Sequence, residues 1–158
     1  MTDTQRLIKR YQNLLRFSGL FNIVLASPLI IPGVSVWYLI LLSDLNRMLG
    51  LGGREFAVPS DPLQALLINT AGIGLVLIGA MVLYASARPL ARSGIVLLNA
   101  GGRLTFCVIV VYYVLSAELG RITLVLGIAD ALIGIGFLYF LIKFRAGTAQ
   151  LPISFPIP

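Results

Sequence analysis

An uncharged, apolar run from Leu63 to Ala85 sets the strongest limit on how this chain can fold. A helix needs about 20 such residues to cross the hydrocarbon core of a bilayer. Comparable runs begin near residues 17, 94 and 122. Lipid offers no hydrogen bonds to the backbone, so each run must satisfy its own peptide groups as a helix. The sequence predicts an all-α integral membrane protein, a four-transmembrane-helix bundle with spans at about 17–33, 63–85, 94–115 and 122–142.

The composition agrees with this class. Of the 158 residues, 58% are hydrophobic and 11% are charged, whereas a soluble domain carries roughly a quarter charged residues. Four spans and their connections use almost the whole chain. We therefore predict a single membrane domain over residues 1–158.

The first apolar run is longer than one span and contains Pro28 and Pro32. Because proline removes a helix donor and clashes with the preceding turn, we favour a span that ends near Gly33 and is followed by an interfacial helix at about 35–49. The alternative is one kinked span that continues to Leu42. Before this run, residues 1–16 place apolar side chains at helical spacing among basic ones, which predicts an amphipathic lead-in lying on the membrane surface.

The basic residues lie mainly at the ends of the apolar runs and predict the topology. With the N-terminus inside the cell, eight of them are cytoplasmic (Arg6, Lys9, Arg10, Arg16, Arg88, Arg92, Lys143 and Arg145) and three are external (Arg47, Arg54 and Arg121). This bias satisfies the positive-inside rule, so both termini are predicted to be cytoplasmic. It also accounts for the net charge of +6 without nucleic acid, since basic runs with interleaved aromatics are lacking.

Several chemistries are excluded by residue types that the sequence lacks. With no histidine, histidine-ligated haem, histidine-rich di-iron sites and a Ser–His dyad cannot form. Cys107 is the single cysteine, which excludes an intrachain disulfide and a four-cysteine cluster. Lys9 and Lys143 flank the apolar runs, so neither can form a Schiff base at mid-membrane. The sequence predicts no metal site and no evident cofactor.

Two charged residues lie inside predicted spans. Arg103 is about 15 Å from the cytoplasmic start of the third span. Asp130 is roughly 20 Å from the cytoplasmic end of the fourth span, so the two lie at similar depths. An unpaired charge in hydrocarbon costs at least about 2.5–3.5 kcal/mol, so we expect the two to pair, with Asn99 one helical turn from Arg103 completing an intramembrane polar cluster. The pair is interpreted as a clamp between two spans, as a binding or proton-handling site, or as a snorkelling arginine beside a protonated aspartate.

Small residues indicate where helices pack closely. Ala65, Gly72, Gly79 and Ser86 recur every seven residues in the second span, and Gly127, Ala131 and Gly134 lie beside Asp130 in the fourth. We expect them to pack within the chain, with self-association as the alternative. Residues 147–158 contain three prolines and no charge, which predicts an extended tail resting on the bilayer or in a groove of another membrane protein.

The proline-interrupted first run, the motif YASARP after the second span and GIADALIGIGFLYFLIK at the close of the fourth resemble small bacterial membrane proteins of the DoxX-like or BphX-like kind. The resemblance covers most of residues 14–145 in layout. It implies a four-helix bundle in a bacterial inner membrane, with no site residues to carry over.

Three functions are compatible with the sequence. The first is a non-catalytic accessory subunit of a larger membrane assembly, favoured by the scarcity of reactive side chains and by the apolar tail. The second is a binder or carrier of a small lipophilic molecule (a lipid, quinone or pigment) that uses the cluster of Arg103, Asp130 and Asn99. The third is a proton-coupled transporter or enzyme with Asp130 as proton carrier. The partners expected are membrane lipids together with another membrane protein or a second copy.

Overall fold

The computed structural model describes residues 3–148, with side chains through residue 144. Five helices make up nearly all of this part: α1 (Asp3–Ile30), α2 (Val34–Met48), α3 (Pro62–Ser86), α4 (Ser93–Ser116) and α5 (Ile122–Thr148). Four of them, α1, α3, α4 and α5, are long and apolar enough to cross a membrane. The chain is a multi-pass membrane protein with a four-span helical bundle, as the hydropathy predicts.

The N-terminal lead-in differs from its prediction. Residues 3–16 are helical, but they continue without a break into the first span instead of lying apart on a membrane surface. Tyr11 and Leu15 are fully buried, and the Tyr11 ring stacks on Phe140 of α5 at 5.0 Å between centroids. The apolar stripe was identified correctly, but it packs against another helix of the bundle and not against lipid.

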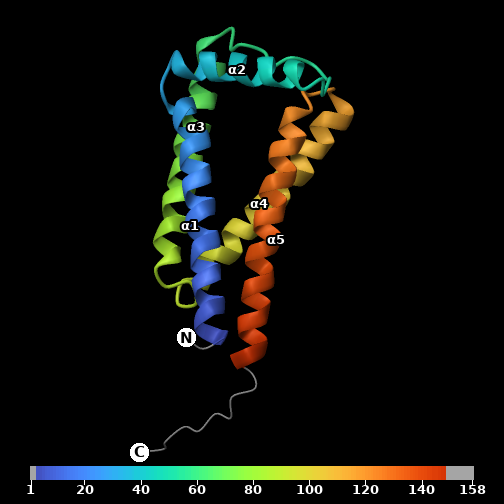
Figure 1. Cartoon of the computed structure of the whole chain (residues 1–158). Coiled ribbons are helices and arrows are strands. Elements are labelled where there is room, and N and C mark those ends of the chain that lie inside the picture. Colours follow the sequence, from blue (N-terminus) through green and yellow to red (C-terminus); the bar gives the residue numbers. More distant parts are fainter. Residues whose placement is uncertain (1–2, 149–158) are drawn as a thin grey trace, which may run out of the picture.

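The prolines end the first span, as we favoured. Although Pro28 lies inside α1, the helix stops at Ile30, and Gly33 turns the chain with φ = 83°, a left-handed conformation that glycine adopts without a Cβ clash. The next helix, α2, lies across one end of the bundle (Figure 1). The alternative of one kinked span to Leu42 is wrong, and the interfacial helix predicted at 35–49 corresponds to α2.

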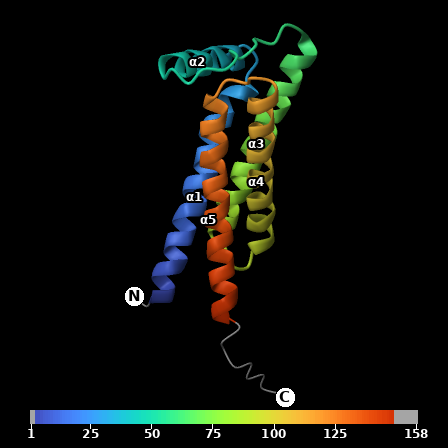
Figure 2. The same cartoon turned by 90° about the vertical axis from the view of Figure 1, so that its right-hand side faces the viewer.

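The spans form two close pairs. Helix α1 packs along α3, and α4 packs along α5, while contacts between the pairs are sparse. In Figure 1 the pairs diverge towards α2, and Figure 2 shows, from the side, α2 lying over the ends of α1 and α5. The end with the N-terminus also holds the turn between α3 and α4 and the last turns of α5.

The hydrophobic core occupies only the half of the bundle nearer the N-terminus. Its buried members come from the start of α1, the end of α3, the start of α4 and the end of α5: Tyr11, Leu15, Val82, Ala85, Val96, Ala100, Ile133, Phe137 and Leu141. The other half, below α2, is not closed by a comparable cluster. The tail predicted to be extended from residue 147 differs in that α5 continues to Thr148, and its remainder, 149–158, lies outside the described residues.

Candidate functional site

The site is centred on Arg103, in the middle of α4. Its side chain is 3% exposed, which is rare for an arginine unless its donors are satisfied. Small residues permit this position: a Cβ on Gly134 of α5 would lie 3.3 Å from the Arg103 Cβ, so α4 and α5 approach closely beside the arginine. The guanidinium also lies over the ring of Phe137, 5.8 Å from its centroid.

The Arg103 guanidinium donates to acceptors on three helices. Within α4, Nε donates to Asn99 Oδ1 at 2.8 Å, and Nη1 forms an ion pair with Asp130 Oδ1 on α5. From α1, Ser18 Oγ accepts from Nη2 at 2.7 Å and Asn22 Oδ1 accepts from the same nitrogen at 3.0 Å. These contacts join the α1/α3 pair to the α4/α5 pair.

The structure brings together the three residues predicted to form the intramembrane cluster, Arg103, Asp130 and Asn99, and adds two from α1. The sequence gives no signal for the contribution of Ser18. Two polar residues of α3, Asn69 and Thr70, are not part of this cluster. Asn69 instead donates to the Leu29 carbonyl at 2.6 Å, an acceptor near the end of α1 that the interrupted helix leaves without its usual partner.

A cavity of about 530 Å³ lies directly beside this cluster and extends from the edge of the core, at Val82, to α2. Its walls are apolar side chains of α1, α3 and α4, such as Leu25, Ile78 and Phe106, and its polar floor is formed by Asn22, Asn99, Arg103 and Asp130. A mostly apolar pocket with a few convergent polar groups is the usual form of a small-molecule site.

The cavity opens sideways between α3 and α4. The wall residues that α1 contributes are buried or half-buried, whereas several of those on α3 and α4 are exposed, including Met81 and Leu98. Leu98 is the most open of them at 80%. Because α3 and α4 are spans, this opening faces the hydrocarbon of the bilayer and not water.

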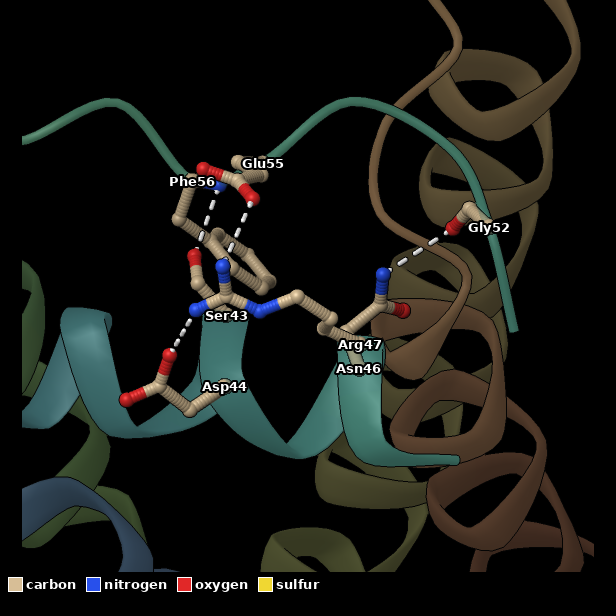
Figure 3. A network of polar contacts seen from close by, with 7 residues as sticks. All are labelled: Ser43, Asp44, Asn46, Arg47, Gly52, Glu55 and Phe56. Carbon is tan, nitrogen blue, oxygen red and sulfur yellow. Dashed lines mark hydrogen bonds and ion pairs between the residues drawn. The ribbon is translucent and has the colours of Figure 1, made fainter. Parts of the chain in front are cut away.

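Helix α2 forms the roof. Tyr38, Leu39 and Leu42 line the cavity, and burial raises the pKa of the Tyr38 phenol above its usual value. A polar residue of α2 holds the following loop, as Figure 3 shows: Ser43 Oγ accepts from the Phe56 amide at 3.0 Å.

Two further residues of α2 fix the roof to the rest of the molecule. Asn46 donates to the Gly52 carbonyl at 3.0 Å (Figure 3), and its Oδ1 accepts from the backbone amide of Ile122 at 2.9 Å, which satisfies a donor at the start of α5 that has no partner within its own helix. Arg47 pairs with Asp44 and approaches Glu55 at the exposed surface.

The small residues predicted to pack helices lie mainly at intrachain contacts. A Cβ on Gly79 would be 2.8 Å from the Gly19 carbonyl oxygen of α1, and one on Gly72 would be 2.8 Å from the Leu29 Cβ. In the other pair, a Cβ on Gly127 would meet Val110 at 3.3 Å. Ala65 and Ala131 are half-buried. Glycine thus sets the close approach within each helix pair.

The fold and the site together define a multi-pass helical membrane protein with a lipid-facing apolar cavity that ends on a buried arginine–aspartate pair. No protein family matches the chain, and no curated protein or solved structure is significantly similar to it. The resemblance to DoxX-like or BphX-like proteins therefore stays a prediction. Within residues 3–144, His, Cys, Asp and Glu form no group of three or more that could hold a metal ion.

Proposed function

We propose that this protein binds a small lipophilic molecule in the cavity between its two helix pairs. The observation that carries the proposal is the position of the polar cluster at the floor of an apolar cavity of about 530 Å³. A pair that served only to clamp α4 to α5 would need neither the space beside it nor the polar groups that α1 adds. The volume falls within the range of small-molecule sites, about 300–1,000 Å³.

The bilayer is the source of this molecule in our proposal. The opening between α3 and α4 is lined by exposed apolar side chains such as Met81 and Leu98, so a ligand dissolved in the hydrocarbon can enter without crossing a polar surface. The roof residues Tyr38, Leu39 and Leu42 separate the cavity from the aqueous side of α2. A lipid, quinone or pigment fits this arrangement better than a water-soluble substrate.

Two neighbouring glycines of α4 allow a matched test. A Cβ on either Gly101 or Gly102 would have open space around it, but only Gly102 lines the cavity. Gly102→Phe should therefore fill the cavity, whereas Gly101→Phe should place the same ring outside it. Native mass spectrometry of the purified full chain would measure co-purifying lipophilic molecules and the binding of added heptadecan-2-one.

We expect Gly102→Phe to lower occupancy at least tenfold, while Gly101→Phe keeps the occupancy of the unmodified protein. Equal occupancy in the two variants would overturn the proposal, because the cavity would then not be the binding site. So would an unmodified protein that carries no small molecule and does not bind heptadecan-2-one.

We also propose a bacterial inner membrane as the location, with both termini in the cytoplasm. The start of α1, the turn between α3 and α4 and the end of α5 lie at one end of the bundle, and α2 lies at the other (Figure 1). By sequence, this turn carries Arg88 and Arg92, and the end of α5 carries Lys143. The excess of basic residues at the first end favours a cytoplasmic position. Reporter fusions after Arg92 and after Arg145 should both read cytoplasmic, and an external reading from either would reverse or break this topology.

A further inference from the structure

Building on the proposed lipophilic ligand, we infer that its head group is neutral and accepts hydrogen bonds, as a ketone or ester oxygen does. The cavity floor favours such a head group through the distribution of its donors, acceptors and charges. Each of these can be read from the contacts of the Arg103 guanidinium.

Within the described residues, the two asparagines at the cavity floor, Asn22 and Asn99, keep their amide nitrogens free. A guanidinium has donors and no acceptor, so Asn22 and Asn99 can bond to it only through their amide oxygens, which is what the structure shows. Each amide nitrogen is thereby turned away from Arg103. Neither nitrogen has a hydrogen-bond partner among the residues that the structure describes, and both side chains line the cavity.

Arg103 itself has few donors left for a ligand. Four hydrogen bonds, to Asn99, Asp130, Ser18 and Asn22, occupy most of its five N–H groups. The guanidinium is therefore occupied by the protein, and the free donors at the floor are those of the asparagine amides. A ligand oxygen that accepts from them would satisfy groups that otherwise stay unpaired beside an apolar cavity.

The net charge of the cavity floor selects against charged head groups. Arg103 and Asp130 are paired, so the floor carries no net charge in its ionised form. An anionic or cationic head would bring an unbalanced charge into an apolar space, which is strongly unfavourable. The site therefore favours a neutral head over a fatty-acid carboxylate or an amine.

Four probes with the same 17-carbon length test this inference: heptadecan-2-one, heptadecanoic acid, heptadecylamine and heptadecane. They are added together to the full-length protein in mild detergent at pH 9, where the acid and the amine are both charged, and bound species are counted by native mass spectrometry. We expect the ketone to bind at least fivefold better than the alkane, as one net hydrogen bond predicts, and at least tenfold better than either charged probe.

Two variants separate the head-group contact from the stability of the cluster. Asn22 and Ser18 both accept from Arg103 Nη2, but only Asn22 lines the cavity. Asn22→Leu should lower the ratio of bound ketone to bound alkane about fivefold, whereas Ser18→Ala should leave this ratio unchanged. Every variant meets the same micelles, so differences in probe partitioning cancel.

Equal binding of the ketone and the alkane, or a preference for the acid or the amine, would overturn this inference while the proposed function stands. An equal loss of the ketone preference in Asn22→Leu and Ser18→Ala would also overturn it, because the asparagine amide would then not be the donor. Failure of all four probes and of co-purifying molecules to occupy the cavity would instead overturn the proposed function itself.

Discussion

Replacing Asp130 by leucine is the sharpest test of the buried ion pair. The substitution removes the only opposite charge that contacts Arg103 among the described residues, and a guanidinium cannot neutralise itself by losing its proton. Breaking a buried pair on one side costs about 3–5 kcal/mol. Because Arg103 keeps three neutral acceptors and the Asp130 side chain is 18% exposed, we expect the lower end, about 3 kcal/mol of unfolding free energy.

Arg103→Leu should cost less, although it removes four hydrogen bonds. The carboxylate left behind can bind a proton, and hydrogen bonds between membrane helices average only about 0.6 kcal/mol each. We expect a loss of about 2 kcal/mol, and about the same for the double variant, which leaves no charge unpaired. The double variant should then lose about 3 kcal/mol less than the two single losses combined, a coupling at the upper end of the range measured for contacting residues.

The assay is unfolding of the purified chain in mixed micelles with rising sodium dodecyl sulfate, followed by far-ultraviolet circular dichroism. Ser18→Ala serves as the control, since Arg103 Nη2 keeps Asn22 as an acceptor, and it should lose no more than about 1 kcal/mol. Additive losses from Arg103→Leu and Asp130→Leu would refute the reasoning, because they would show that the two side chains do not stabilise each other. Single variants as stable as the unmodified protein would refute it as well.

The same unfolding assay tests two other contacts. Gly79→Val places a side chain 2.8 Å from the Gly19 carbonyl oxygen and should lower the unfolding free energy by about 1–3 kcal/mol, while Gly74→Val, whose Cβ would have open space, should change it far less. Asn46→Ala removes the cap on the Ile122 amide and should cost about 1 kcal/mol with faster amide exchange at the start of α5. Asp44→Ala removes only an exposed ion pair and should cost less. Equal losses from Gly79→Val and Gly74→Val would contradict the close helix contact, and equal losses from Asn46→Ala and Asp44→Ala would contradict the helix cap.

The four-span bundle was predictable because span length and backbone hydrogen bonding leave few choices in lipid. The place where the first span ends was also predictable, since Pro28 and Pro32 restrict the helix there. The start of the first helix was not. A stripe that includes Tyr11 and Leu15 has the same spacing whether it faces a membrane surface or another helix, and only the position of α5 decides between them.

The candidate site was predictable in part for a related reason. Charges inside spans are costly, so the depths of Arg103 and Asp130 predict that they pair. The role of Ser18 could not be predicted, because a serine in a helix commonly bonds to a carbonyl of its own preceding turn. The cavity itself could not be predicted either, since its volume depends on the angle between the helix pairs, which no local pattern specifies.

The polar cluster and the cavity beside it are two consequences of one packing arrangement. Close glycine contacts such as that of Gly79 with Gly19 make α1 and α3 one tight pair, and α4 and α5 form the other. The core joins the pairs in only one half of the bundle, and α2 spans the other end. Arg103 lies where the core stops, so its bonds to Ser18 and Asn22 connect the pairs at the point where they begin to diverge. Hydrogen bonds at this point also form the floor of the space beyond it, so the contacts that join the helix pairs place polar groups at the end of the cavity.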